Sequence, residues 1–310
     1  MTTLSCILAV ALAAQAPAKP LTADDYVGRW NVRLTDAPDT FVSGGIRIDK
    51  TGDALSGGLV WRWGSYAPVK SAEVKDGVLR MVRGEAAGKQ DVLEARLEGD
   101  LLKGQVTYPD GKMHHFEGRR APLLLSKKAP VWGRAVTLFD GKTLNGWRLR
   151  DPKAKNGWAV VNGELAVVDP KDNADLVSER TFQDLKLHIE FNVDAKSNSG
   201  VYLRGRYEVQ ILDNPDAKMA LDTHGCGAVY SRLSPATDAT KPAGEWQTLD
   251  IEFAGRQVTV TLNGKTVVKG SVDGVTGGAL SPYEEEPGPL MLQGDHGKVR
   301  FRNIVVTPGK

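Results

Sequence analysis

Two neighbouring segments of the chain, residues 200–204 and 207–212, alternate between apolar and polar side chains. Successive side chains of a β-strand point to opposite faces of a sheet, so this alternation predicts two half-buried strands. One set of side chains suits a protein core and comprises Val201, Leu203, Val209 and Ile211. The other set offers an aromatic ring, a cation, a carboxylate and an amide, from Tyr202, Arg204, Glu208 and Gln210. A sheet face with this mixture of groups is suited to holding and polarising a sugar.

Short runs of the same kind recur along the 310-residue chain, separated by glycine-containing turns such as Asn263-Gly264. This pattern predicts an all-β protein, and the length suits about two domains. Residues 22–122 are expected to form a small antiparallel barrel, whose Gly28-Arg29-Trp30 opening resembles that of lipocalin-like barrels. Residues 123–135 are interpreted as a linker. Residues 136–308 are expected to form a two-sheet jelly-roll sandwich that includes a strand at Gly227–Tyr230.

The first residues of the chain are apolar and contain Ala-x-Ala patterns at positions 11–16. We interpret residues 1–18 as a secretory signal peptide, which predicts a secreted or periplasmic protein; a disordered or buried N-terminal segment is the alternative. Cys226 would then be the only cysteine of the processed chain, so no internal disulfide is expected. No other segment is long and apolar enough to predict a membrane span.

The charges of the chain nearly balance, with 40 Lys and Arg residues against 38 Asp and Glu residues. No run of basic residues occurs, so nucleic acid is not an expected partner. The acidic run Glu284–Glu286 is interpreted as a solvated loop.

Four blocks of the second half of the chain occur in a fixed order: Leu138–Trp147, Ser197–Gly205, Tyr207–Asp213, and Leu292–Gly297 with Val299–Ile304. Together they resemble the 3-keto-disaccharide hydrolase domain family of secreted and periplasmic bacterial proteins. The resemblance covers the second domain only. It implies a concanavalin-like jelly roll and action on oligosaccharides or glycosides whose C3 hydroxyl has been oxidised to a ketone.

A ketone at C3 acidifies the hydrogen on C2, so a base can remove that proton and the C1 oxygen can leave by β-elimination. This chemistry needs a base that works near pH 7, a donor for the ketone oxygen and an acid for the leaving group. His296 is the first candidate for acid–base work because an imidazole titrates near neutral pH, and Asp295 is placed to orient its ring. Glu208 is expected to act as a base or to bind sugar hydroxyls; a structural ion pair with Arg204 is the alternative.

The other candidates bind the substrate or orient the groups that react. Arg204 is expected to polarise the ketone, and Gln210 to orient its neighbours, because an amide does not titrate usefully. Asp213 either stabilises a turn or joins Glu208 and His296 as a catalytic group or as a ligand of a divalent cation. The expected substrate-binding set is completed by Tyr202, Tyr230, Trp246 and Gln293.

Several alternatives stay open. Tyr230 and Trp246 are either rings on which a sugar stacks or ordinary core residues. The jelly roll can bind carbohydrate without cleaving it, because a fold does not fix a function. The barrel can serve as an adaptor for a small ligand or a surface. His224 and Cys226 are interpreted as part of a pocket-lining loop, since no third residue orients them as a nucleophile pair.

Overall fold

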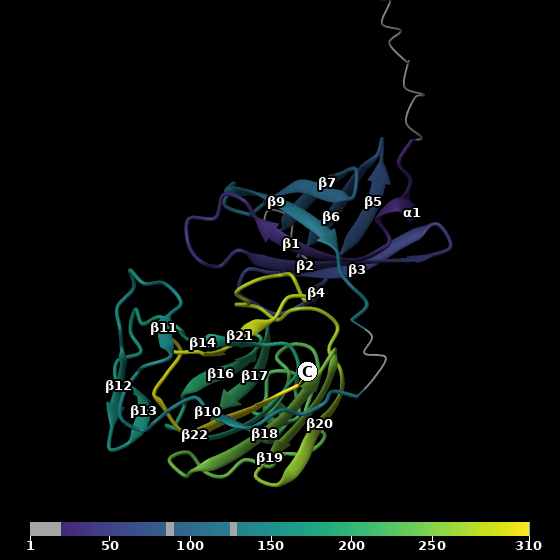
Figure 1. Ribbon diagram of the computed structural model, residues 1–310. Coiled ribbons are helices and arrows are strands. Elements are labelled where there is room, and N and C mark those ends of the chain that lie inside the picture. Colours follow the sequence, from purple (N-terminus) through teal and green to yellow (C-terminus); the bar gives the residue numbers. More distant parts are fainter. Residues whose placement is uncertain (1–19, 85–89, 125–128, 310) are drawn as a thin grey trace, which may run out of the picture.

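The computed structural model describes residues 20–84, 90–124 and 129–309; the predicted signal peptide lies outside these residues. Their architecture is almost entirely β, with two helices of four residues each, α1 (Ala23–Tyr26) and α2 (Ala217–Ala220). Within these ranges no helix is long and apolar enough to cross a membrane. Figure 1 shows two bodies, a barrel formed by the N-terminal part of the chain and a sandwich formed by the rest.

The barrel is an eight-stranded meander in which each strand pairs with the next and the first pairs with the last. This closure removes the free sheet edges that an open sheet of this size would expose. A short ninth strand, β4 (Ala67–Pro68), pairs with β3 at Gly58 and Leu59, next to the single β3–β5 pair at Leu55. The barrel strands are β1 (Gly28–Leu34), β2 (Ser43–Thr51), β3 (Ala54–Trp61), β5 (Ser71–Lys75), β6 (Val78–Arg83), β7 (Asp91–Glu98), β8 (Leu101–Thr107) and β9 (Met113–Arg120).

Large apolar side chains fill the interior of the barrel. Trp30, Trp61 and Phe116 are each at most 4% exposed and belong to a single buried cluster. Eight strands leave an interior just wide enough for side chains or for one small ligand. The side chains of this cluster occupy that interior, and the adaptor function of the barrel stays a prediction.

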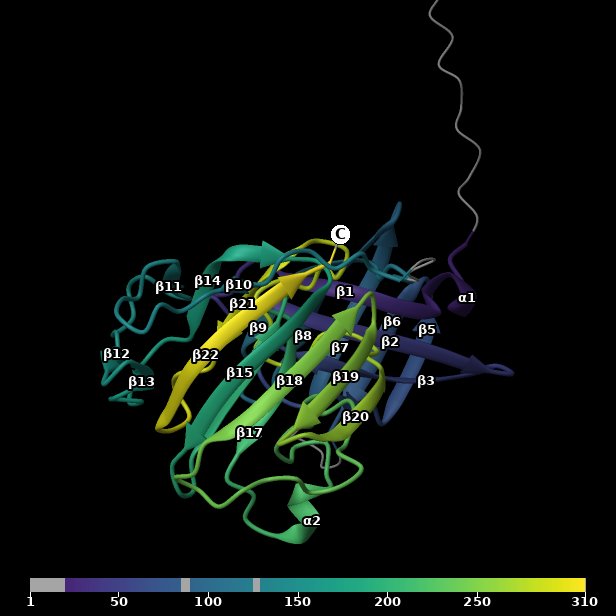
Figure 2. The same cartoon turned by 60° about the horizontal axis from the view of Figure 1, so that its bottom comes forward.

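The second body is a sandwich of two antiparallel sheets, as the alternation predicts. Figure 2 looks onto the larger, eight-stranded sheet, which runs in the order β12-β13-β22-β15-β18-β19-β20 with β10 beside β22. Its strands are β10 (Val136–Thr137), β12 (Trp158–Val161), β13 (Glu164–Val167), β15 (Leu185–Val193), β18 (Gln247–Ala254), β19 (Gln257–Leu262), β20 (Lys265–Ser271) and β22 (Val299–Pro308). The smaller sheet has five strands in the order β11 (Trp147–Leu149), β14 (Leu176–Phe182), β21 (Gly288–Leu292), β16 (Asn198–Leu203) and β17 (Tyr207–Leu212).

The apolar face expected of residues 200–212 is buried between the two sheets. Val201, Leu203, Val209 and Ile211 all belong to the main core cluster and are fully buried. The predicted turn at Asn263-Gly264 is also present, with φ of 50° and 79° at these two residues, as a type I′ turn requires.

The strand expected at Gly227–Tyr230 is absent, and this prediction was wrong. Val229 forms only isolated bridges, to Val209 and to Leu233. The segment lies between two left-handed residues, Gly227 with φ +84° and Ser231 with φ +57°, which turn the chain at both ends. A run of four residues so confined cannot extend into a ladder.

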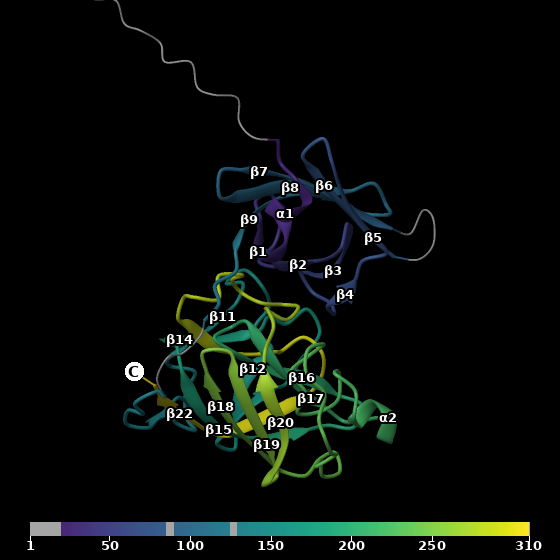
Figure 3. The same ribbon diagram turned by 90° about the vertical axis from the view of Figure 1, so that its right-hand side faces the viewer.

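The barrel packs on the outer face of the five-stranded sheet, with segment 272–287 between the two bodies (Figure 3). Part of the contact is apolar, because Val60 of β3 joins Val275 and Ala279 of this segment in a small buried cluster. A polar contact is made by Glu284, which is fully buried. Glu285 and Glu286 are exposed, so the expectation of a solvated acidic loop was wrong for Glu284 alone.

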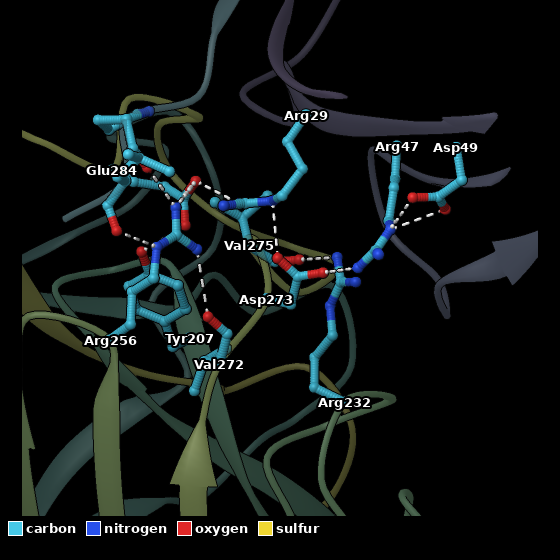
Figure 4. A network of polar contacts seen from close by, with 12 residues as sticks. Arg29, Arg47, Asp49, Tyr207, Arg232, Arg256, Val272, Asp273, Val275 and Glu284 are labelled. Atoms are coloured by element: carbon cyan, nitrogen blue, oxygen red, sulfur yellow. Dashed lines mark hydrogen bonds and ion pairs between the residues drawn. The ribbon is translucent and has the colours of Figure 1, made fainter. Parts of the chain in front are cut away.

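Figure 4 shows how Glu284 joins the two bodies. Its Oε2 binds Arg29 of the barrel at 2.6 Å and Arg256 of the sandwich at 3.1 Å, while Tyr207 donates its hydroxyl to Oε1 at 2.9 Å. Arg29 also binds Asp273 at 2.8 Å. A buried carboxylate needs such partners, since an isolated charge in the interior is very costly.

We expect Glu284→Gln to lower the free energy of unfolding by about 3 kcal/mol, because it removes the carboxylate that pairs with the buried Arg256 and leaves Arg29 with Asp273 alone. The matched control is Glu285→Gln, since Glu285 is exposed and adjacent; its effect should stay within about 0.5 kcal/mol. Chemical denaturation followed by fluorescence measures both. Equal stability of the two variants would contradict the role given to Glu284.

Candidate active site

A cavity of about 320 Å³ lies between the outer face of the five-stranded sheet and the barrel. The sandwich contributes polar side chains from β16 and β17, together with residues from the loops that flank β14 and β21. The barrel contributes Phe41, Trp63 and Gly64. The residues that the sandwich contributes are Asp175, Asn198, Tyr202, Glu208, Gln210, Tyr230, Gly277, Gly278, Gln293, Asp295 and His296.

Glu208 is the central acidic group of this cavity. It is 4% exposed, and its Oε2 accepts a hydrogen bond from the Tyr202 hydroxyl at 2.9 Å. With its side-chain amide oriented to donate, Gln210 reaches Glu208 Oε1 at 3.3 Å. Burial raises the pKa of Glu208 to about 8, although the hydrogen bond from Tyr202 opposes this shift. A carboxylate with that pKa is a much stronger base than an ordinary glutamate and still ionises near neutral pH.

Gly200 makes room for the Glu208 side chain. It lies on β16 beside β17, and a Cβ atom at this position would be 2.3 Å from Glu208 Oε1. A side chain larger than hydrogen therefore cannot occupy position 200 unless Glu208 moves.

His296 is the second titratable group of the cavity. Its Nδ1 forms a hydrogen bond with Asp295 Oδ1, as expected from the sequence. This bond raises the pKa of His296 against the opposing effect of burial, and the negative charges of Asp295 and Glu208 add to the shift. The imidazole therefore carries its proton at a higher pH than a free histidine, which suits it to donate a proton.

Asp175 supports the loop that carries His296. Its carboxylate accepts hydrogen bonds from the Gly294 amide and from Arg150 Nη1, each at 3.2 Å. Asp175 is 6% exposed, and burial raises its pKa even though Arg150 opposes this. Asp175 was not predicted as a site residue, because it precedes β14 in a segment without alternation.

Two amide oxygens of the cavity lack a partner. Asn198 Oδ1 and Gln293 Oε1 are buried and accept no hydrogen bond from the described residues. Buried polar atoms are nearly always paired in folded proteins, so these two cavity-lining amides are candidate partners of a ligand. The hydroxyl groups of a sugar are donors of the required kind.

Most of the predicted site residues share this cavity. The structure brings six of them together: Tyr202, Glu208, Gln210, Tyr230, Gln293 and His296. Their common position follows from the alternation on β16 and β17 and from the neighbouring loops. The expected face of polar groups is therefore present, although some of the residues predicted for it lie elsewhere.

Arg204 does not line the cavity. β16 ends at Leu203, and Arg204 adopts a left-handed conformation with φ +53°, which takes its side chain off the alternating face. Its guanidinium lies over the rings of Tyr207 and Phe253 and donates to the Gly255 carbonyl at 2.7 Å. The alternative of an ion pair with Glu208 is wrong for the same reason.

Asp213 and Trp246 also lie outside the cavity. Asp213 follows the end of β17 and accepts a hydrogen bond from the Lys196 amide at 2.8 Å, which is the turn-stabilising arrangement. Trp246 precedes β18 of the other sheet, and its ring packs under Arg302 at 4.0 Å. Alternation cannot tell which of two sheets a strand will join.

The divalent-cation site considered for Glu208, Asp213 and His296 is not assembled, because Asp213 is not in the cavity. Across residues 20–84, 90–124 and 129–309, no group of three or more His, Cys, Asp or Glu side chains is arranged to hold a metal ion. Cys226 is buried, which raises the pKa of its thiol to about 12 and makes it a poor nucleophile.

Residues 134–307 match the model of the 3-keto-α-glucoside-1,2-lyase-like domain family, and this match spans more than half of the chain. The chain belongs to this family. The resemblance expected from the four sequence blocks is therefore confirmed. The matched region contains the whole sandwich from β10 onward and excludes the barrel.

Two similar proteins can be compared with the chain. A 3-keto-disaccharide hydrolase of Bacteroides thetaiotaomicron is 27% identical in an alignment of 143 residues, with coverage of 36% of this chain and 49% of that protein. The chain thus matches about half the length of this relative. A candidate glycosyl hydrolase of Parabacteroides distasonis, known from a crystal structure, is 27% identical with a TM-score of 0.48, over 59% of this chain and 93% of that one.

The raised pKa of Glu208 makes stability depend on pH in a defined direction. Between pH 4.5, the ordinary value, and about 8, the folded protein keeps a proton that the unfolded chain releases. The contribution of Glu208 to the free energy of unfolding therefore decreases as pH rises through this range, by up to about 1.4 kcal/mol per pH unit.

We expect Glu208→Gln, which cannot ionise, to be more stable than the unmodified protein, by a margin that grows from pH 5 to pH 8. Denaturation at several pH values measures this margin. Glu285→Gln serves as the control, because an exposed carboxyl should give a margin near zero throughout. A constant margin for Glu208→Gln would show that the pKa of Glu208 is unperturbed.

Proposed function

We propose that the protein cleaves glycosides whose C3 hydroxyl has been oxidised to a ketone, by removing the C2 proton and eliminating the C1 oxygen. The observation that carries this proposal is the pair of titratable groups in one cavity. Glu208 is a buried carboxyl with a pKa of about 8, and His296 has a raised pKa. The family to which the chain belongs gives the class of substrate.

The reaction begins with transfer of the C2 proton to a carboxylate oxygen of Glu208. The electron pair of the C2–H bond forms a C2–C3 double bond, and the ketone oxygen becomes an enolate. That electron pair then forms a C1–C2 double bond as the C1–O bond breaks. The leaving oxygen takes a proton from His296, so an alcohol and an unsaturated ketone are produced.

The same site then gives one of two products. Release of the unsaturated ketone makes the protein a lyase. Addition of water, with hydroxide to C1 and a proton to C2, makes it a hydrolase. The proton transfers are the same as in the elimination, run in the opposite direction, so Glu208 and His296 serve both steps.

The remaining groups of the cavity have supporting functions. Tyr202 and Gln210 hold the Glu208 carboxyl by the hydrogen bonds described above. Amide groups from Asn198 and Gln293 supply partners for the sugar hydroxyls and for the oxygen at C3. Hydrogen bonds to that oxygen strengthen as it becomes an enolate, which lowers the barrier.

We also propose that the protein acts outside the cytoplasm. The apolar N-terminus with its Ala-x-Ala patterns supports export. Binding of carbohydrate without cleavage is the competing function, because unpaired amides in a cavity would serve it equally well.

The elimination breaks the C2–H bond and can incorporate hydrogen from the solvent at C2, whereas direct hydrolysis leaves that bond intact. Incubation with a 3-keto-glucoside in D2O should give either the unsaturated ketone or a 3-keto sugar with one deuterium at C2, detected by mass spectrometry against an enzyme-free control. Glu208→Gln should slow both cleavage and exchange by about 10²–10⁴-fold. His296→Gln should slow cleavage while the unreacted substrate still gains deuterium.

A hydrolysed product without deuterium, together with a cleavage rate that does not fall when C2 of the substrate carries deuterium, would rule out the proposed elimination. Binding without cleavage or exchange would favour the carbohydrate-binding function. If Glu208→Gln still incorporated deuterium at C2 and His296→Gln did not, His296 would be the base and Glu208 the acid.

We expect Gly200→Ala to reduce turnover of a 3-keto-glucoside by about 100-fold or more, because the added methyl group must displace the Glu208 carboxyl. Stability should fall by only about 1–3 kcal/mol, the usual cost of overpacking. Steady-state kinetics and thermal denaturation separate the two effects. The control is Gly45→Ala in β2, where a Cβ would meet no atom closer than 3.4 Å. Unchanged turnover in Gly200→Ala would contradict the central position of Glu208.

A further inference from the structure

The barrel lies outside the region that matches the family, yet it forms one wall of the cavity. Phe41 comes from the loop between β1 and β2, and Trp63 and Gly64 come from the loop after β3. Trp63 is 59% exposed, which is unusual for a tryptophan. An exposed tryptophan at the wall of a polar cavity is a feature that ligand binding would explain.

Phe41 is held in place by a side chain of the sandwich. The Arg150 guanidinium carbon lies 3.8 Å from the centre of the Phe41 ring. Arg150 also donates to the Thr40 carbonyl at 3.1 Å and to the Gly278 carbonyl at 2.6 Å. Since Arg150 is 6% exposed and binds Asp175 as well, the ring is fixed relative to the site.

Trp63 is positioned by its neighbours in the barrel. Its ring meets Phe41 edge to face, with centroids 5.5 Å apart, and Arg62 lies 4.1 Å from its centre. Arg62 has a left-handed backbone with φ +50°, which is strained for a residue with a Cβ atom. The Arg62 carbonyl accepts a hydrogen bond from the Gly278 amide at 2.7 Å. The strained residue is therefore itself in contact with the sandwich.

The rest of the loop is fastened to the sandwich by close contacts. Ser65 Oγ lies 2.8 Å from His224 Nε2, and the Tyr66 amide donates to Ser231 Oγ at 2.6 Å. A Cβ atom at Gly277 would be 2.3 Å from the Gly64 carbonyl oxygen, so the two backbones touch. The loop is therefore docked before any ligand arrives.

The contact of Ser65 with His224 resembles part of a hydrolytic triad, since His224 Nδ1 lies 2.6 Å from Asp222 Oδ1. The backbone amide that follows the serine, that of Tyr66, is already bound to Ser231. It therefore cannot stabilise an oxyanion. We interpret Ser65, His224 and Asp222 as a polar contact that holds the barrel against the sandwich.

We propose that Trp63 and Phe41 form the subsite for the leaving group, and that they select substrates in which this group is a sugar or aromatic ring. The inference rests on the proposed function. The ring that reacts must bring C2 to the buried Glu208, whereas Trp63 is exposed. The part of the substrate that extends toward Trp63 is then the group attached through the C1 oxygen. A flat indole surface suits stacking against a ring and offers nothing to a methyl group.

The test compares two substrates that differ only in the leaving group, methyl 3-keto-glucoside and a 3-keto-disaccharide. Trp63→Ala should lower kcat/KM for the disaccharide by about tenfold and change that for the methyl glycoside by less than threefold. Trp63→Phe should recover part of the loss. Trp246→Ala is the matched control, because Trp246 lies outside the cavity, and it should not change the ratio of the two values.

An equal effect of Trp63→Ala on both substrates, or no effect on either, would overturn the subsite. If the unmodified protein cleaves neither substrate, the proposed function fails, and calorimetric binding of the two sugars decides the subsite separately. Weaker binding of the disaccharide alone by Trp63→Ala would support it, and unchanged binding would overturn it.

Discussion

The arrangement of the whole molecule depends on one buried carboxylate between two domains. Glu284 is fully buried and holds Arg29 of the barrel and Arg256 of the sandwich at the same oxygen. Arg256 also donates to the Pro122 carbonyl at 2.8 Å, at the point where the chain leaves the barrel. Such a charge is stable only when all its partners are present, so the contact favours one relative position of the two bodies.

That position creates the buried environment of Glu208. The outer face of a sheet in a sandwich ordinarily meets water, and a carboxyl there would keep an ordinary pKa. Here the barrel and segment 272–287 cover that face, and the resulting burial raises the pKa of Glu208. The same cover leaves polar groups on the cavity wall that bind no other side chain, such as the amide oxygen of Gln293. The raised pKa of Glu208 and the unpaired amide oxygen of Gln293 thus have a common cause.

The sequence predicted those features that depend on local pattern. Alternation identified the strands and the core face of β16 and β17, and the ordered blocks identified the family. It also placed Tyr202, Glu208 and Gln210 on one face, since each lies inside a strand. Arg204 was misplaced because a left-handed turn begins at the end of that strand, and periodicity carries no information beyond it.

Contacts between distant segments could not be predicted in this way. Trp246 was assigned to the site although the strand that follows it, β18, joins the other sheet. Glu284 was taken for a surface residue although two domains bury it. Trp63 and Phe41 had no signal at all, because their importance arises only when the barrel docks on the sandwich. Asn198 could have been predicted from the sequence, since it lies in the block Ser197–Gly205.

The central claim is that Glu208 takes a proton from the carbon next to an oxidised position of a bound sugar. A crystal structure of Glu208→Gln with an intact 3-keto-disaccharide tests it most directly. The account predicts that C2 of the oxidised ring lies within about 3.5 Å of the amide at position 208, in near-attack geometry, with the C1 oxygen toward His296. A sugar bound in the cavity with C2 turned away from position 208, or bound elsewhere on the protein, would contradict it.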